Sequence, residues 1–299
     1  MVAVKGIRNI AAWCISIFFI LFGFTKKAKR RALNGDYILS IYFHTPNKKL
    51  FEFCVKWLIR NKFTILSQSE LLQIQQESLP FPKGGVVITL DDGWQSNIDN
   101  VVPIAEKYKV PVTIFIAVDS VVSGDFWWSY AEKASAIKLT QYSVAYLKTI
   151  PNDEREKIVY ELKCKVKLNR LAMTVDQLKH IAKSKYVTIG SHTMSHPILV
   201  NCSDEKTFFE LKESKEILEE WLSREVIYFA YPNGDYSSRE INYLKAFKYK
   251  LAYTTAPVYL TKSSLKKEFE IPRFEVFENV SYAEAICRML GVWQKTIKK

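Results

Sequence analysis

The sequence predicts an α/β fold built on parallel strands, with a membrane helix at its N-terminus. Short β-branched runs alternate with segments of helical spacing, which is typical of repeated βα units. Two of these runs lead straight into clusters of Asp or His, and strand ends are where α/β folds keep their functional groups. Residues 9–25 form a stretch of 17 residues without a charge, close to the length of a membrane span.

In the first half of the chain, local sequence patterns indicate where strands and helices lie. The predicted strands are rich in β-branched or aromatic residues and lie at 37–43, 63–66, 86–88 and 112–116. Residues 50–59 have the apolar spacing of a helix. Ser67 and Glu70 form a capping-box pattern, which predicts that the next helix begins there.

The second half is richer in predicted helix. Residues 130–183 are expected to be largely helical, a strand is expected at 186–189, and 208–222 has apolar residues at helical spacing. Residues 281–293 predict a final amphipathic helix. No internal repeat, low-complexity tract or long flexible linker interrupts the chain, so everything after the basic stretch that follows Phe24 is expected to form one domain.

The net charge of +12 does not indicate a nucleic-acid partner. Residues 1–31 contribute +7 and residues 291–299 contribute +3, which leaves +2 for the rest of the chain. A nucleic-acid-binding surface would need an excess of basic residues on the globular part. The basic residues instead flank the uncharged N-terminal stretch, which favours a membrane as partner.

Two segments about a hundred residues apart carry the chemistry. Asp91 and Asp92 follow one predicted strand, and His192 and His196 follow another. One Asp and two neutral His suit zinc or a similar divalent ion and leave positions open for water and substrate. The second Asp should point away from the ion, because neighbours on an extended segment alternate, and it suits a general base. A lone Asp-Asp-Gly is most often a turn, but two of the chain's four His in one short stretch argue against coincidence.

These segments resemble the first two motifs of the polysaccharide deacetylases, the NodB-homology or carbohydrate esterase 4 family. The resemblance covers residues 37–276: residues 229–234 (Phe-Ala-Tyr-Pro-Asn-Gly) are similar to the third motif, and residues 271–276 (Ile-Pro-Arg-Phe-Glu-Val) to the family's Pro-Arg segment. The motif layout is most similar to the poly-N-acetylglucosamine deacetylase branch. The resemblance implies a distorted (β/α)7 barrel of the NodB type.

The resemblance also implies a role for each motif residue. Asp91 would be the general base, while Asp92, His192 and His196 would hold a divalent metal ion, with Zn²⁺ preferred over Co²⁺ or Ni²⁺. Members of the family hydrolyse the N-acetyl groups of amino sugars with a metal-activated water. The third motif would place a backbone donor for the developing oxyanion in residues 231–233.

The sequence departs from the family's common pattern at two positions. No His follows His196, whereas many members take the acid that protonates the leaving amine from a C-terminal Leu-x-His motif. His44, at a strand end, is the better replacement, because His180 lies in a segment with amphipathic helical spacing; His44 could also be a satisfied structural group. Ala230 stands where many relatives have an Arg that orients the base. Arg273 is expected to take that role, unless the base is held differently or Arg273 is a plain structural ion-pair partner.

Aromatic side chains indicate where a sugar would bind. Trp94, Trp127 and Trp128 offer flat apolar surfaces for sugar rings, and a similar aromatic run follows the first motif in related enzymes. Aromatics are also ordinary core residues, so we expect at least one of Trp127 and Trp128 to line the cleft. Tyr231 and Asn233 complete the set of predicted substrate contacts.

The N-terminal segment divides the chain into an anchor (1–25), a basic linker (26–36) and a catalytic domain (37–299). As a helix the uncharged stretch spans about 25 Å at about 1.5 Å per residue, and flanking basic side chains can reach the rest of a hydrocarbon core of about 30 Å. A cleaved signal peptide would need a small-residue site after Phe24, which is absent. A buried core helix is disfavoured by the lack of an amphipathic pattern and by Trp13 and the basic flanks.

The orientation of this anchor stays open. Five positive charges after the segment against two before it favour a cytoplasmic catalytic domain, while most members of the family act on exported glycans. The five cysteines are odd in number and scattered, which fits reduced thiols better than a disulfide framework.

The sequence therefore predicts a hydrolase of carbon–nitrogen bonds other than peptide bonds. It would be a metal-dependent N-deacetylase that acts on the acetamido group of amino sugars in a glycan or a lipid-linked glycan. Two alternatives remain. A catalytically silent, membrane-tethered glycan-binding module would keep the barrel without turnover, and a deformylase of a lipid-linked amino sugar would share the mechanism but release a different acyl group.

Overall fold

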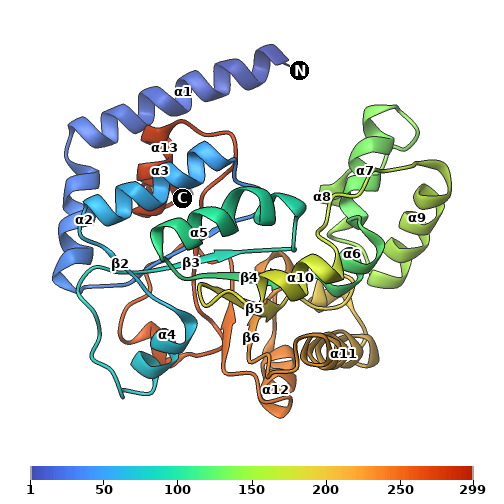
Figure 1. Cartoon of the computed structure of the whole chain (residues 1–299). Helices are drawn as coiled ribbons and strands as arrows, with labels where there is room; N and C mark the ends of the chain where they lie inside the picture. Colours follow the sequence, from blue (N-terminus) through green and yellow to red (C-terminus); the bar gives the residue numbers. More distant parts are fainter. Residues whose placement is uncertain (1, 298–299) are drawn as a thin grey trace.

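The sheet is entirely parallel among its named strands, as the computed structural model shows (Figure 1). The structure describes residues 2–297, without the side chains of residues 2–5, 7 and 295–297; Met1 of the predicted anchor and Lys298 and Lys299 of the predicted domain lie outside it. The strand order is β7-β6-β5-β4-β3-β1-β8, with β2 beside β3. The predicted α/β class is confirmed. The strands are β1 (Leu39–Phe43), β2 (Thr64–Ile65), β3 (Gly85–Leu90), β4 (Val112–Ile116), β5 (Val187–Ser191), β6 (Tyr228–Ala230), β7 (Leu251–Tyr253) and β8 (Phe274–Glu275).

Irregular backbone joins the two edges of the sheet. The segment before β8 binds β7: the N–H of Thr254 donates to the carbonyl of Ile271 at 2.8 Å, and the N–H of Arg273 donates to that of Ala256 at 3.1 Å. Pro272 lies in this segment and has no N–H, so a regular strand ladder cannot continue through it. β8 then pairs with β1. The result is a curved sheet whose two edges are joined by irregular backbone and not by a regular ladder, which is consistent with the predicted distorted (β/α)7 barrel.

Helices surround the sheet, and α7, α8 and α9 form a lobe of their own at the right of Figure 1. This lobe has its own hydrophobic cluster, which includes Trp127, Ala131 and Leu162. The helices are α1 (Val2–Leu21), α2 (Phe24–Asn34), α3 (Lys48–Arg60), α4 (Gln68–Gln75), α5 (Val102–Tyr108), α6 (Val118–Ser123), α7 (Trp127–Ala136), α8 (Val144–Leu147), α9 (Asn152–Lys165), α10 (Val175–Ile181), α11 (Asp204–Leu222), α12 (Ser238–Ala246), α13 (Tyr282–Met289) and α14 (Val292–Ile297), with a π-helical turn η1 (Asn97–Val101) and short 3-10 turns η2 (Leu199–Asn201), η3 (Pro232–Gly234) and η4 (Ser264–Lys266).

Local signals located most elements well. Helix α4 begins at the predicted capping box, in which the hydroxyl of Ser67 accepts from the N–H of Glu70 and the Glu70 carboxylate accepts from the N–H of Ser67. Strands β1, β3 and β4 are buried along their whole length, which is typical of parallel strands covered on both faces.

The predicted final helix at 281–293 is wrong in one respect, because it is two helices. Helix α13 ends before Gly291, which has a φ of +66°, and α14 begins at Val292. A β-carbon at Gly291 would lie 2.4 Å from the ring of Phe274, so only glycine allows this close approach. Gly291 is therefore a helix stop that the apolar periodicity did not show.

The N-terminal segment is helical and packed, and it is bent. No single helix within residues 2–297 is long and apolar enough to cross a membrane, although the pair Arg8–Leu21 and Phe24–Asn34 qualifies by length and composition across a bend of 61°. Phe19 packs edge-on against Trp293, and the predicted basic linker lies mostly in α2. The division into anchor, linker and domain stays a prediction.

Candidate active site

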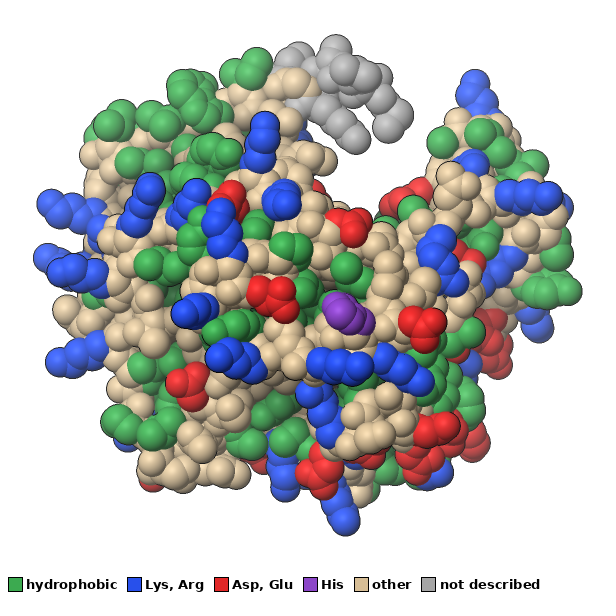
Figure 2. Space-filling view, viewed as in Figure 1, with side chains coloured by type: hydrophobic (Ala, Val, Ile, Leu, Met, Phe, Trp, Pro, Cys, Tyr) green, Lys and Arg blue, Asp and Glu red, His purple; other side chains and the backbone are tan. Residues whose placement is uncertain are grey.

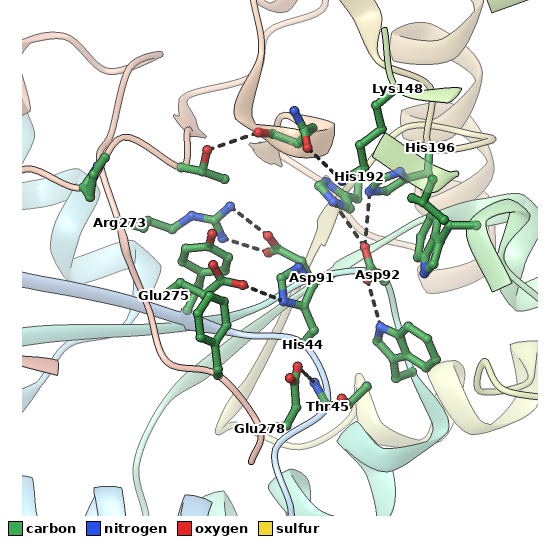
Figure 3. Close-up of a pocket in the computed structure, with 18 of the residues that line it drawn as sticks. His44, Thr45, Asp91, Asp92, Lys148, His192, His196, Arg273, Glu275 and Glu278 are labelled. Carbon is green, nitrogen blue, oxygen red and sulfur yellow. Dashed lines mark hydrogen bonds and ion pairs between the residues drawn. The ribbon is translucent and has the colours of Figure 1, made fainter. Parts of the chain in front are cut away.

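A cleft of ≈ 1020 Å³ lies between the barrel and the α7–α9 lobe, and the hollow is visible in Figure 2. It is lined by Asp91 and Asp92 after β3, by His192 after β5 and by His44 after β1. These strands are parallel, so their carboxyl ends meet at one edge of the sheet. The sequence motifs are therefore brought together at this edge (Figure 3).

Asp92, His192 and His196 converge as a set of metal ligands. Their donor atoms lie within 4.8 Å of one another, and Oδ1 of Asp92 is 3.4 Å from Nε2 of His192 and 3.3 Å from Nε2 of His196. This Oδ1 is buried and accepts no hydrogen bond from the residues that the structure describes, while Oδ2 accepts one from Nε1 of Trp94 at 2.8 Å. An uncompensated buried carboxylate oxygen facing two imidazoles fits a divalent cation, and the Asp-His-His donor set suits zinc.

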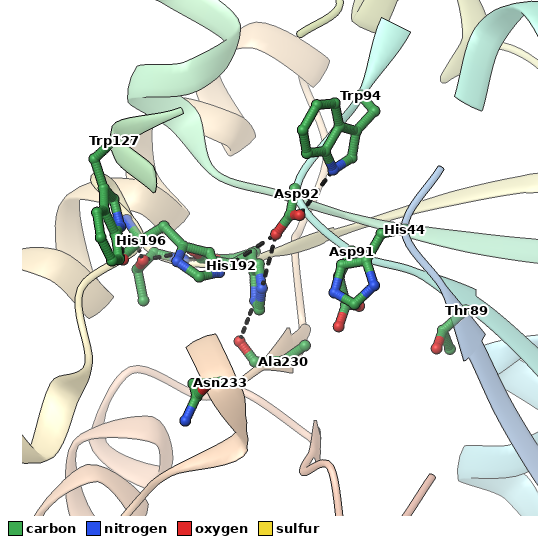
Figure 4. Close-up of polar contacts among 12 residues, drawn as sticks. His44, Thr89, Asp91, Asp92, Trp94, Trp127, His192, His196, Ala230 and Asn233 are labelled. Carbon is green, nitrogen blue, oxygen red and sulfur yellow. Dashed lines mark hydrogen bonds and ion pairs between the residues drawn. The ribbon is translucent and has the colours of Figure 1, made fainter. Parts of the chain in front are cut away.

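The protonation of the two imidazoles also fits metal binding. Nδ1 of His192 lies 2.7 Å from the carbonyl oxygen of Ala230, which only accepts, so Nδ1 carries a proton and Nε2 is the nitrogen that faces Asp92 (Figure 4). Burial lowers the pKa of His196 to about 4, although the neighbouring Asp92 carboxylate opposes this. His196 is therefore neutral near pH 7, as a ligand must be.

Three residues of the site have a left-handed backbone conformation, which changes the direction in which their side chains point. Asp92 has a φ of +79°, His196 of +55° and Asn233 of +59°. Such conformations cost non-glycine residues of order 1–3 kcal/mol each and cluster at functional sites. They also correct the prediction about the two neighbouring carboxylates: β3 ends at Leu90, so Asp91 and Asp92 diverge because the chain turns at Asp92, and not because a strand alternates.

Asp91 forms a bidentate ion pair with Arg273. Nη1 of Arg273 donates to Oδ1 at 2.7 Å and Nη2 donates to Oδ2 at 2.8 Å, as Figure 3 shows. The guanidinium is fully buried, and it also donates to the hydroxyl of Thr89 and to the carbonyl of Thr254. Two parallel N–H···O bonds fix the plane of the carboxylate, so the geometry orients Asp91 rigidly.

The Arg273 guanidinium also keeps Asp91 ionised. Burial alone raises the pKa of Asp91, but the attraction of Arg273, reinforced by His192 and His44, outweighs it and lowers the pKa below its ordinary value. An ionised carboxylate held in one orientation is what a proton acceptor requires. Arg273 reaches Asp91 from the segment before β8, the neighbour of β1 in the sheet.

His44 lies among carboxylates at the floor of the cleft. Its Nδ1 is 3.5 Å from Oε1 of Glu275, and its side chain is one third exposed. Burial lowers the pKa of His44, but the charges of Asp92, Asp91, Glu275 and Glu278 together raise it above its ordinary value. His44 is thus easily protonated, which suits a proton donor; a cation bound at Asp92 would oppose the effect.

Two of the predicted aromatic contacts line the cleft and two do not. Trp94 and Trp128 line the cleft, and the ring of Trp128 lies 4.5 Å from that of His196. Trp127 does not: it is buried, and its Nε1 donates to the carbonyl of His196 at 3.0 Å. The ring of Tyr231 is fully buried and packs against Tyr236, so its side chain is not brought to the cleft.

Asn233 is the part of the third motif that faces the cleft. The N–H of Tyr231 donates to the carbonyl of Tyr253, and Pro232 has no N–H, so the predicted backbone donor is reduced to Asn233. Its side-chain oxygen accepts from Nζ of Lys148, a cleft residue that follows α8. Asn233 therefore connects the barrel to the lobe.

Three residues in the cleft or behind it were missed from the sequence. The Glu210 carboxylate, fully buried on α11, accepts from the N–H groups of Met194 and Ser195 and so holds the loop that carries His196. Glu275 beside His44 and Lys148 in the cleft were also not singled out. Glu275 lies inside a motif that resembles the family, which was a usable signal; Glu210 and Lys148 look like ordinary residues of helical segments.

Comparison with protein families and known sequences gives a consistent result. A family model described as "Polysaccharide deacetylase" matches residues 78–252. YxkH, a predicted polysaccharide deacetylase of Bacillus subtilis (strain 168), is 23% identical over 211 residues, which are 70% of this chain and 58% of that protein. The poly-beta-1,6-N-acetyl-D-glucosamine N-deacetylase of Staphylococcus aureus (strain MSSA476) is 33% identical over 95 residues, which are 29% of this chain and 32% of that protein. The chain thus spans 58% and 32% of these relatives.

Solved structures show the same fold. The Streptococcus pyogenes deacetylase PplD in complex with acetate superposes with a TM-score of 0.61 at 20% identity, covering 85% of this chain and 97% of that chain. IcaB from Ammonifex degensii superposes with a TM-score of 0.62 at 16% identity, with the same two coverages. At these identities the likeness shows the fold alone.

Proposed function

The chain belongs to the polysaccharide deacetylase family, and from that premise we propose that it is a metal-dependent N-deacetylase. Its substrate would be an N-acetylated amino sugar in a glycan or a lipid-linked glycan. The observation that carries the proposal is the Arg273-bound Asp91 beside the Asp92–His192–His196 ligand set on the floor of one cleft.

Each residue of the site has a separate role in hydrolysis. A divalent ion held by Asp92, His192 and His196 would supply polarisation of the amide carbonyl and activation of water near neutral pH. Asp91 accepts the proton of the attacking water, and His44 donates a proton to the amide nitrogen as the carbon–nitrogen bond breaks. Acetate and a free amine result. The backbone N–H of Asn233 would donate a hydrogen bond to the oxyanion.

The residues that replace the two missing family residues support an active enzyme over a silent binding module. A silent module would require that the missing Arg at Ala230 and the missing C-terminal His are real losses. Arg273 forms with Asp91 the ion pair that the missing Arg would have made, and His44 lies in the cleft with a raised pKa. Both replacements favour the enzyme.

The form of the cleft supports a saccharide as substrate. Trp94 and Trp128 provide flat apolar surfaces beside the ligand set, and Lys148, Asn233 and Glu278 provide polar groups around it. Sugar rings are bound by this combination of aromatic faces and hydrogen-bonding groups. Of the named substrates of relatives, poly-N-acetylglucosamine is the one that the motif layout and the Staphylococcus aureus relative favour.

The decisive experiment measures acetate release by the full chain from N-acetylglucosamine oligomers and from lipid-linked N-acetylated amino sugars. We expect release that chelator abolishes and that Zn²⁺, Co²⁺ or Ni²⁺ restores, with Asp91→Asn as the inactive control. Binding of a glycan without chelator-sensitive release of acetate would contradict the proposal. Assaying formate in parallel separates the deacetylase from a deformylase.

We also propose that the N-terminal segment associates the protein with a membrane. The proposal is supported by the uncharged stretch at 9–25 and by its basic flanks. The excess of positive charge after the stretch favours a catalytic domain on the cytoplasmic face. Most members of the family act on exported glycans, which favours a catalytic domain on the outside. Labelling of an introduced cysteine near Asp36 from outside intact cells separates the two.

A further inference from the structure

From Ile10 to its end at Leu21, helix α1 carries no charged side chain on any side, although only one side is covered. Ala12, Ser16 and Phe19 are buried, and the thiol of Cys287 on α13 donates to the carbonyl of Ser16. The other sides, together with Phe22 just after the helix, are exposed and form what we call the α1 outer face: Ile10 (64% exposed), Trp13 (49%), Ile15 (39%), Phe18 (46%), Leu21 (76%) and Phe22 (69%). Figure 2 shows it as the green surface at the upper left.

This pattern differs from that of an ordinary surface helix. A helix on the surface of a soluble domain turns charged or polar residues to water, whereas an all-apolar helix is normally covered on every side. The outer face is also continuous, since the ring of Phe18 lies 4.3 Å from that of Phe22 and 6.3 Å from that of Phe24. A continuous exposed apolar surface of this kind marks a site of association with something apolar.

The charge beside the outer face indicates what covers it. Helix α2 leaves α1 at a bend of 61°, and its exposed Lys26, Lys27 and Arg30 lie along one groove with Lys29. No acidic residue occurs before Asp36 to neutralise them. A second copy of the chain would bring two such basic helices together. An apolar strip bordered by positive charge instead complements a bilayer with anionic headgroups.

We propose that the α1 outer face lies in the plane of an anionic lipid bilayer, with the basic residues of α2 on the headgroups and the active-site cleft opening beside the membrane surface. The hollow in Figure 2 opens at the top of the view, on the side of the molecule where Figure 1, seen from the same direction, places α1. Trp293, which lines the cleft, has its ring centre 6.3 Å from that of Phe19. The orientation of the cleft toward a membrane-held sugar rests on the proposed function, but the docking itself does not.

An in-plane helix fits the structure better than a spanning one. The uncharged run before the bend, from Asn9 to Leu21, has 13 residues and extends about 20 Å, well short of a hydrocarbon core of about 30 Å. Spanning would also pull Ser16 and Phe19 away from α13 and α14. Lying in the plane keeps these contacts and covers only the face that is exposed.

Labels at successive positions separate the two arrangements. The full chain carries one environment-sensitive fluorophore on a single cysteine at position 10, 14, 18 or 21, with vesicles of phosphatidylcholine and phosphatidylglycerol and quenchers at known depths. Cys14 is a natural exposed position, so it is kept for the label at position 14 and replaced by serine in the other three proteins; the other exposed thiol, Cys164, is replaced by serine in all four. We expect similar shallow depths at all four sites. A steady change of about 1.5 Å per residue would mean a spanning helix and overturn the proposal.

Matched variants test the surface itself. Phe18→Ser with Phe22→Ser should weaken binding to anionic vesicles by about tenfold or more, while Phe208→Ser with Phe209→Ser, two Phe of similar exposure on α11, should leave binding unchanged. Replacing Lys26, Lys27 and Arg30 by alanine should weaken binding about fivefold per residue at low salt, and little in neutral vesicles. Equal binding by all variants would contradict the docking surface.

Two further readouts separate this inference from the proposed function. Deacetylation of a soluble oligomer should be the same in the Phe18/Phe22 variant and the unmodified chain, while deacetylation of a lipid-anchored sugar in vesicles should fall with binding. Vesicle binding without any deacetylation would support the membrane docking and contradict the proposed deacetylase activity. A dimer in solution that Phe18→Ser and Phe22→Ser dissociate, without vesicle binding, would assign the face to self-association and overturn the docking.

Discussion

The charge on the His44 ring is set by carboxylates from different segments of the chain. Glu275 and Glu278 come from the end of the barrel, and Asp91 and Asp92 from the end of β3. Their combined field counteracts burial and favours the imidazolium. The backbone at His44 is also held in place, because Nδ2 of Asn97 donates to the carbonyl of His44 at 2.7 Å.

Replacing His44 tests the proton donor directly. We expect His44→Ala to lower kcat for deacetylation by about 10²- to 10⁴-fold with little change in KM, because a departing amine needs a proton. His180→Ala, at an exposed position on α10, is the control and should have no effect. If His44→Ala retained full turnover while Asp91→Asn abolished it, the assignment of His44 would be wrong.

Glu275 should tune the pH dependence of the same step. A proton donor is active below its pKa, and Glu275 raises the pKa of His44, so it extends activity to higher pH. Glu275→Gln removes that negative charge, and the basic limb of the kcat–pH profile should move to lower pH. An unchanged basic limb would show that His44 and Glu275 do not interact in the reaction.

The Asp91–Arg273 pair should be strongly coupled in stability. Arg273→Met leaves a buried, unpaired carboxylate, and we expect the free energy of unfolding to fall by about 3–5 kcal/mol. Adding Asp91→Asn removes the stranded charge, so the double variant should lose less than the sum of the two single variants. Urea denaturation of the four proteins measures this coupling, and strictly additive losses would rule it out.

At the scale of elements, α12 is fixed by a buried carboxylate at its first turn. Glu240 accepts from the N–H and hydroxyl of Ser237 and from Nε of Arg239. Arg239 in turn donates to the carbonyls of Leu199 and Cys202, just after the loop that carries His196. The capping box thus links α12 to the segment behind the candidate metal site.

This capping box predicts a pH-dependent contribution to stability. Burial raises the pKa of Glu240, but hydrogen bonds from Ser237 and Arg239 outweigh it and lower the pKa. A lowered folded-state pKa stabilises the fold fully above the ordinary glutamate pKa of about 4.3, and the effect is lost as pH falls through the folded value.

Glu240→Gln should therefore cost about 1–3 kcal/mol of unfolding free energy at pH 7, and the difference from the unmodified chain should shrink below about pH 4.3. Glu220→Gln, at an exposed position on α11, is the control and should cost little at any pH. A deficit for Glu240→Gln that stays constant down to pH 3 would contradict the assigned shift.

At the scale of the whole molecule, α1 is part of the folded unit. Phe19 is buried against the C-terminal helices, whereas its neighbour Phe18 faces outward. Nearby, the hydroxyl of Tyr37 donates to the carbonyl of Ala28, which fastens α2 to the start of the barrel. The structure thus joins the predicted anchor and linker to the domain by tertiary contacts.

Two neighbouring phenylalanines test this arrangement. Phe19→Ala should lower the free energy of unfolding of the full chain by about 3–5 kcal/mol, as expected for a buried aromatic side chain, while Phe18→Ala should change it by less than about 0.5 kcal/mol. A detached anchor would make the two variants equal in urea denaturation. That outcome would restore the predicted division at residue 25.

The sequence by itself determined β1 to β5, several of the helices around them and the identity of the motif residues, but not β6, β7, β8 or α12. β-branched runs, capping residues and short polar motifs are local signals, so they can be recognised without knowing the fold. The parallel sheet then guaranteed that Asp92 and His192 would meet at one edge. The carboxyl end of each strand is fixed by its chain direction alone.

Only the tertiary structure decided which side chains meet at the site. Asp91 and Arg273 are 182 residues apart, and their pairing depends on how the segment before β8 joins the barrel. Trp127 and Trp128 are neighbours on one helix, yet only Trp128 faces the cleft. Periodicity identifies a helical face, but the partner of each face is set by packing between elements distant in the chain, and no local pattern records it.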